Sequence, residues 1–146
     1  MKSCILAIAA LCAATNAPAQ QPEMIQPPGT VVGIPFTPAV RVGNMLYLSG
    51  QIGNVPGTTQ LVDTGIARQT GQALENIKAL LTYAGSSLER VAKCTVFLAD
   101  IRDFGKMNEV YRTYFPKNPP ARSTVAGSGL ALGARVEIEC LATVGS

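Results

Sequence analysis

Apolar and polar residues alternate along this chain with two periods, the two-residue period of a strand and the 3.6-residue period of a helix. Residues 91–98, 122–126 and 135–144 are predicted to be strands, and residues 40–52 a strand pair that turns at Gly43. The last of these strands alternates most regularly. One of its faces carries Val136, Ile138, Cys140 and Ala142, and the other carries Glu137, Glu139, Leu141 and Thr143. The pattern therefore predicts a sheet with at least one apolar face.

Two segments with the helical period lie between the strands. The first helix is predicted to begin with Asp63 or Thr64 as its cap and to end at Gly85. The second is predicted to begin with Asp103 as its cap and to end before the proline-rich residues 116–120. The apolar positions are Ile66, Ala73, Leu74, Ile77, Leu80, Leu81 and Ala84 in the first helix, and Phe104, Met107, Tyr111, Tyr114 and Phe115 in the second.

The resulting element order is strand, strand, helix, strand, helix, strand, strand. Two amphipathic helices can cover only one face of such a sheet. We expect the remaining face to carry Glu137, Glu139 and Arg122. A small domain with a half-apolar open face commonly buries it by forming an oligomer.

The first residues resemble a secretory signal peptide. Lys2 precedes an uncharged apolar run over residues 4–14, and Ala17-Pro18-Ala19 has the small-x-small pattern of a cleavage site. The alternative is a buried N-terminal helix. Cleavage after Ala19 would make the protein periplasmic or secreted. The domain organisation is then a signal peptide over 1–19, a flexible proline-rich lead-in over 20–30 and a single domain over 31–146.

Composition narrows the chemistry that this chain can perform. Its 146 residues include no histidine, so Ser-His-Asp and Cys-His catalytic groups and histidine-ligated zinc are excluded. The net charge of +3 is too small to indicate nucleic-acid binding. After cleavage only Cys94 and Cys140 of the four cysteines would remain, as buried thiols or as a disulfide.

Several polar residues are candidates for a site, each with a structural alternative. Arg122 follows Pro119-Pro120 and suits bidentate capture of a carboxylate, or it is an edge-strand arginine paired with a surface glutamate. Glu137 and Glu139 share a strand face and could carry a proton, or they are solvated. If the last two strands formed a plain hairpin, Arg122 would lie near Glu139, and Thr124 near Glu137.

Two further candidates come from the other elements. Ser49-Gly50 ends a strand, where a glycine lets the backbone approach a ligand, or marks an ordinary bulge. Asn108 lies in the apolar stripe of the second helix, either as a core amide or as a site residue.

Four segments together resemble the RidA (reactive intermediate deaminase, YjgF-type) family. They are Gly43-Asn44-Met45-Leu46-Tyr47-Leu48-Ser49-Gly50-Gln51-Ile52, Gln72-Ala73-Leu74-Glu75-Asn76-Ile77-Lys78, the run from Phe104 to Phe115 with Met107-Asn108-Glu109-Val110-Tyr111, and Pro120-Ala121-Arg122-Ser123-Thr124-Val125 with Val136-Glu137-Ile138-Glu139. The resemblance extends from about Val31 to Thr143. It implies an α+β, chorismate-mutase-like fold, with a mixed sheet of about six strands, two helices on one face and a homotrimer closed around the other.

The resemblance also implies an activity. Family members hydrolyse reactive enamines and imines such as 2-aminoacrylate to 2-oxo acids and ammonia, as 2-iminobutanoate/2-iminopropanoate deaminases, without a cofactor or metal. The partners would be a small imino or 2-oxo acid and two further copies of the chain, with no nucleic acid and, after signal cleavage, no membrane. The alternatives are a non-catalytic trimer that binds small carboxylates and, ranked last, an endoribonuclease.

Site roles follow from the same resemblance. Arg122 would hold the substrate carboxylate and Glu137 would activate water, while Ser49 and Gly50 line a pocket between subunits. Asn108 would reach into this site across a subunit boundary. Two lining positions depart from the family pattern: Phe36 stands where tyrosine is frequent, and Thr124 where cysteine is frequent. The fold would also insert the strand of Cys94 between the last two strands, beside Cys140.

Overall fold

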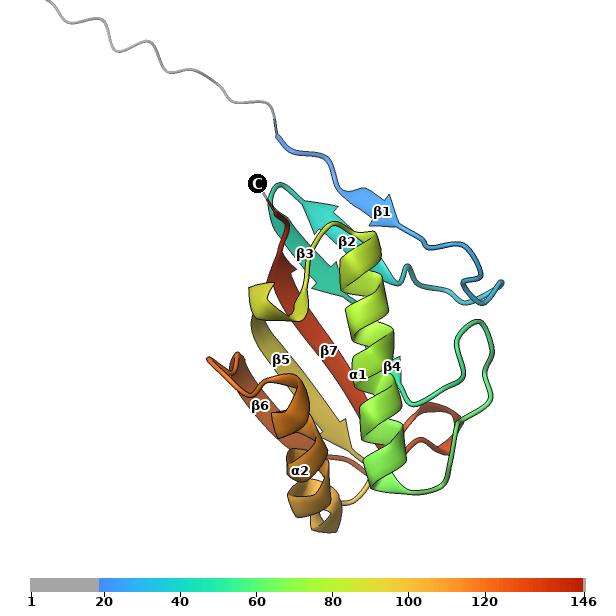
Figure 1. The fold of residues 1–146 in the computed structure, drawn as a ribbon. Helices are drawn as coiled ribbons and strands as arrows, with labels where there is room; N and C mark the ends of the chain where they lie inside the picture. Colours follow the sequence, from blue (N-terminus) through green and yellow to red (C-terminus); the bar gives the residue numbers. More distant parts are fainter. Residues whose placement is uncertain (1–18, 146) are drawn as a thin grey trace, which may run out of the picture.

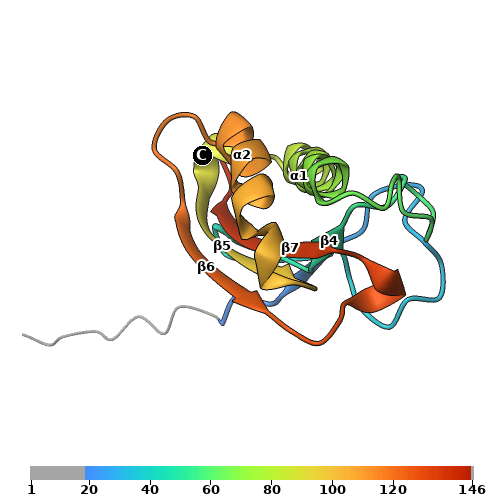
Figure 2. The same cartoon turned by 90° about the horizontal axis from the view of Figure 1, so that it is seen from below.

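The computed structural model describes residues 19–145 and contains one mixed sheet with two helices on a single face (Figures 1 and 2). The helices are α1 (Ile66–Tyr83) and α2 (Phe104–Tyr114). The strands are β1 (Glu23–Ile25), β2 (Ala39–Val42), β3 (Met45–Leu48), β4 (Gln51–Ile52), β5 (Val91–Leu98), β6 (Ala121–Ala126) and β7 (Val136–Thr143). The α+β class and the placement of both helices on one face are confirmed.

The sheet has seven strands, six of which follow the order β1-β2-β3-β7-β5-β6, while β4 pairs with β7. β5 therefore lies between β6 and β7, as the family resemblance implies. The hairpin interpretation of the last two strands is wrong. The connection from β5 to β6 passes through α2, and such a crossover joins parallel neighbours, so β6 pairs with β5 rather than with β7.

Helix α1 begins later than its capping signal predicts. Gly65 is its N-cap, and the Asp63 carboxylate instead accepts a hydrogen bond from the Gly65 N–H at 2.8 Å. The Gln69 side chain donates to the backbone carbonyl of Asp63 and accepts from the Arg135 N–H, at 2.6 and 2.8 Å. The loop before α1 is thus tied to the start of β7. The predicted end of α1 at Gly85 is confirmed, because Gly85 follows the last turn and has a φ of 77°, which favours glycine.

Asp103 is the N-cap residue of α2, but its side chain makes no capping hydrogen bond. The Asp103 carboxylate accepts from Nε of Arg135 at 2.8 Å instead. Asp100 caps the preceding 3₁₀ turn, Ile101–Asp103, by accepting from the Arg102 N–H. The capping role predicted for Asp103 is therefore wrong, because a tertiary ion pair occupies its carboxylate.

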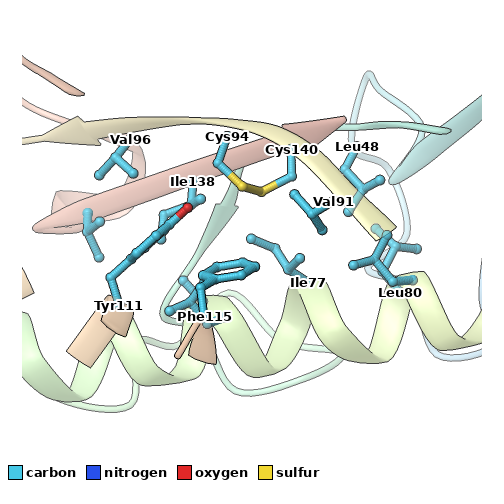
Figure 3. Packing of buried hydrophobic residues seen from close by; sticks show 14 of the residues in the cluster. Leu48, Ile77, Leu80, Val91, Cys94, Val96, Tyr111, Phe115, Ile138 and Cys140 are labelled. Atoms are coloured by element: carbon cyan, nitrogen blue, oxygen red, sulfur yellow. A yellow bond between two sulfur atoms is a disulfide. The ribbon is translucent and has the colours of Figure 1, made fainter. Parts of the chain in front are cut away.

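The hydrophobic core fills the space between the two helices and the sheet (Figure 3). The apolar set of β7 lies entirely in this core: Val136, Ile138, Cys140 and Ala142. A disulfide joins Cys94 of β5 to Cys140 of β7. The sequence allowed either buried thiols or a disulfide for these two cysteines. They form the disulfide because they lie opposite each other in the antiparallel register of β5 and β7.

The proline-rich segment contains a strand that the sequence did not predict. Glu23–Ile25 form β1 and pair with β2 at the edge of the sheet, so part of this lead-in is ordered. The signal-peptide prediction falls almost entirely on residues 1–18, outside the described residues. Among residues 19–145, no helix is both long enough and apolar enough to cross a membrane.

Candidate active site

Arg122 lies on the helix-covered face of the sheet. It is beside Cys94 in the parallel register of β5 and β6, and Cys94 points into the core. Neighbouring residues in register project to the same face, so the expectation that Arg122 shares the open face with Glu137 is wrong. Its guanidinium carbon lies 4.7 Å from the centroid of the Tyr111 ring and 5.8 Å from that of Phe104.

A groove of about 340 Å³ opens beside this guanidinium. Its lining residues are Asn108, Tyr111, Arg112, Phe115, Pro119, Pro120 and Arg122. Asn108 is half-buried and lies in the same groove as Arg122 of the same chain, which favours the site interpretation of this residue over a core amide. Thr124 follows Arg122 by two residues on the same strand face, and its hydroxyl is buried without a hydrogen-bond partner in the described part of the chain.

Gly50 and Glu137 form a second cluster of predicted site residues, and Ser49 connects it to the segment that carries Phe36. The Ser49 hydroxyl donates to the Thr37 carbonyl at 2.6 Å, which ties the segment carrying the exposed Phe36 to the end of β3. A Cβ at Gly50 would overlap the Glu137 carboxylate, so this carboxylate packs directly on the glycine backbone. Gly50 therefore allows a close approach between backbone and side chain, as the sequence indicates, but here the approaching group is Glu137.

Burial raises the pKa of the Glu137 carboxyl above its ordinary value of 4.5, and the nearby charge of Glu139 raises it further. Both effects disfavour the charged form. A glutamate with a raised pKa can take up and release a proton near neutral pH more readily than an ordinary one. Within the described residues, no cluster of three histidine, cysteine or acidic side chains is placed to hold a metal ion.

The predicted site residues thus form two groups on opposite faces of the sheet. The arginine group contains Arg122, Asn108 and Thr124, and the glutamate group contains Phe36, Ser49, Gly50 and Glu137. Because β5 separates β6 from β7 and the two charged side chains project to opposite faces, one chain does not bring Arg122 and Glu137 onto one small ligand.

The aromatic neighbours of Arg122 were not predicted as site residues. In the sequence, Phe104 and Tyr111 are recognisable only as members of an apolar helical stripe. Their spacing of two helical turns, on the face that also carries Asn108, is a signal that could have identified them.

A family model described as Endoribonuclease L-PSP matches residues 30–144 of this chain. The chain belongs to this family. A rat protein named 2-iminobutanoate/2-iminopropanoate deaminase is 46% identical over 110 residues, which cover 75% of this chain and 80% of the rat protein. The human protein of that name is 45% identical over 111 residues, covering 76% and 81% of the two chains.

Solved structures of RidA-type proteins share the fold. A structure of RidA from the Antarctic bacterium Psychrobacter has a TM-score of 0.78 and 38% sequence identity, with 84% of this chain and 99% of that chain covered. The YjgF protein of E. coli gives a TM-score of 0.75 and 34% identity, with coverage of 83% and 98%. These similarities confirm the RidA-type resemblance that the sequence motifs indicate.

Proposed function

We propose that this protein hydrolyses reactive imines and enamines of 2-oxo acids. The enamine tautomerises to an imine, water adds across its C=N bond, and the C–N bond then breaks to give a 2-oxo acid and ammonia. The observation that carries the proposal is the side chain of Arg122, which makes no hydrogen bond or ion pair with the described residues and faces a groove. A cation with unoccupied donors suits a substrate carboxylate. The deaminase names of relatives at about 45% identity support the same reaction.

In this mechanism Arg122 holds the carboxylate of the substrate and Asn108 lies beside it in the groove. Glu137 accepts a proton from the attacking water and returns it to the departing nitrogen. The raised pKa of Glu137 suits both directions of this transfer. Phe36, Ser49, Gly50 and Thr124 would line the pocket. The reaction uses no metal or cofactor in this proposal.

The site would form between two copies of the chain in a homotrimer. One copy would provide the arginine group and its neighbour the glutamate group, because a single chain places them on opposite faces of the sheet. Asn108 would then act with Arg122 of its own chain, and the residues that cross the boundary would be those around Glu137. The uncovered sheet face supports this assembly, since it exposes Tyr47 and Val125.

The disulfide supports the proposal of an oxidising compartment. Cys94 and Cys140 are each about 1% exposed and are joined within the core. Disulfides persist mainly in exported proteins. Signal-peptide cleavage after Ala19 would place the mature protein in a periplasm or outside the cell, and mass spectrometry of natively produced protein tests this point.

Arg122→Ala tests the proposed reaction. An amino-acid oxidase generates the imino acid, and loss of the imine is followed spectroscopically with and without the protein. We expect the wild type to accelerate the loss of the imine. Arg122→Ala should lower kcat/KM by an amount that corresponds to about 2–4 kcal/mol of transition-state stabilisation, because a desolvated charge contact is removed. Arg68→Ala, which changes an exposed arginine of α1, is the matched control.

Other results would favour the other functions. Binding of pyruvate or 2-oxobutyrate without any imine turnover would contradict the hydrolase and favour a carboxylate-binding protein. RNA cleavage that Arg122→Ala abolishes would favour an endoribonuclease.

A further inference from the structure

Arg122 is held by aromatic rings instead of acidic side chains. The rings of Tyr111 and Phe104 lie two turns apart on one face of α2, and their centroids are 4.7 and 5.8 Å from the guanidinium carbon. Four other arginines of the described residues form an ion pair with an aspartate or glutamate: Arg41 with Glu23, Arg68 with Asp63, Arg102 with Asp100 and Arg135 with Asp103. Arg122 differs from these four because its guanidinium contacts aromatic rings and no carboxylate.

The Tyr111 ring is a rigid surface for this contact. It is 4% exposed and packs against Phe115 with a distance of 4.7 Å between ring centroids. Figure 3 shows the Tyr111 side chain extending from α2 toward the sheet, on the side where the Cys94–Cys140 disulfide lies. Its hydroxyl has no hydrogen-bond partner among the described residues, so the ring is fixed by packing and not by a polar contact.

Burial raises the pKa of Tyr111 to about 12, while the charge of Arg122 acts in the opposite direction. The phenol is therefore neutral at pH 7. A neutral ring attracts the guanidinium through its π face. A phenolate or carboxylate in this place would instead neutralise the charge and occupy the N–H donors.

We propose that Tyr111, assisted by Phe104, is a positioning residue that orients the Arg122 guanidinium for a substrate carboxylate while leaving its N–H donors free. This inference rests on the proposed function. A ring restrains the guanidinium from its face, whereas a carboxylate would bind the N–H groups at its edge. The cation is thus pre-organised without being neutralised, which reduces the ordering that substrate binding requires.

Tyr111→Leu removes the inner ring, and Tyr111→Phe retains it while removing the unpartnered hydroxyl. We expect Tyr111→Leu to raise KM for the imino acid, and Kd for 2-oxobutyrate, roughly tenfold, with kcat changed less than about threefold, as the loss of one partly buried cation–π contact predicts. Tyr111→Phe should restore both constants to wild-type values. Tyr114→Leu, on the same helix but outside the Arg122 contact, should lower the melting temperature without raising KM.

Phe104→Leu is a second variant, at a position that tolerates substitution because Phe104 is 40% exposed. It should raise KM roughly threefold without preventing folding, since its ring is the more distant one. Equal KM values for wild type, Phe104→Leu and a folded Tyr111→Leu would overturn the proposal.

Nuclear magnetic resonance separates this inference from the proposed reaction. The δ protons of Arg122 should be shifted upfield by the ring current in wild type and Tyr111→Phe, and this shift should be lost in Tyr111→Leu. A wild-type protein with that shift but without carboxylate binding or turnover would overturn the proposed function and the role of the rings in it. Absence of the shift in a wild type that does turn over imines would overturn the ring contact alone.

Discussion

Glu137 is the residue whose electrostatics connect the fold to the proposed chemistry. Its pKa is raised first by burial and then by Glu139, so the folded state holds a proton more tightly than the unfolded chain does. Between the ordinary value of 4.5 and the raised value, stability therefore falls as the pH rises. The charged carboxylate destabilises the fold at neutral pH, as is common for groups placed for catalysis.

Glu137→Gln should separate activity from stability. We expect imine hydrolysis to fall by about two to four orders of magnitude, because the proton carrier is lost. The variant should be at least as stable as wild type at pH 7 in urea denaturation, and its advantage should disappear as the pH falls below 4.5, where Glu137 is protonated in both states. In wild type, the acidic limb of kcat/KM should lie above pH 4.5. The stability difference between Glu137→Gln and wild type is the quantity to compare at the two pH values. If this difference favoured the variant less at pH 7 than at pH 4, the assignment would be contradicted.

The residue types of this site could be predicted from the sequence, but the face of the sheet on which Arg122 lies could not. Alternation within β6 shows only that Arg122 and Thr124 share a side. Which side faces the helices is fixed by the register with β5, where Cys94 lies beside Arg122. That register depends on the crossover through α2 and is not encoded in the local pattern.

At the scale of elements, the disulfide joins two central strands that are distant in sequence. Cys94 and Cys140 are separated by 46 residues and lie opposite each other in the antiparallel register of β5 and β7. A cross-link of this span restricts the unfolded chain strongly.

Cys94→Ala combined with Cys140→Ala should lower the free energy of unfolding by about 4 kcal/mol, as the loop-closure entropy of a closed loop of this length predicts. Guanidinium denaturation measures the change. Wild type unfolded in the presence of a thiol reductant should show a similar loss. Equal midpoints for wild type with and without reductant would show that the two cysteines are free thiols.

The helices show where capping signals succeed and where they fail. The end of α1 is encoded locally, because Gly85 can adopt the positive φ that ends the helix. The starts of α1 and α2 are not encoded locally, because the polar groups near both helix N-termini have tertiary partners. Asp103 pairs with Arg135, and Gln69 joins Asp63 to the backbone of Arg135. Distant partners of this kind compete with local capping and are invisible to a short sequence window.

At the scale of the whole molecule, the uncovered sheet face decides whether the site can be complete. Both helices cover the opposite face (Figure 2). A row of neighbours in register crosses the uncovered face from Val125 through Phe97 to Glu137. This row places an exposed valine, 48% accessible, two strands away from the proposed proton carrier. The sequence pattern predicted this unpartnered face correctly, together with Glu137 and Glu139 on it.

Val125→Asp tests whether this face closes against other copies. Wild type should sediment at about three times the mass of one chain, and Val125→Asp should shift toward a monomer, because an unpaired charge would be buried between the copies. The substitution should leave an isolated chain folded, since Val125 lies on the edge strand β6. Imine hydrolysis should fall with the fraction of trimer, because Arg122 and Glu137 then no longer meet.

Tyr83→Asp is the matched control, since Tyr83 is similarly exposed but lies at the end of α1 on the helix layer. It should retain both the trimer and the activity. Full activity in a monomeric Val125→Asp would contradict a shared site, and so would a wild type that sediments as an active monomer. In either case the two groups would have to act separately, and the carboxylate anchor at Arg122 would need a proton carrier on its own face of the sheet.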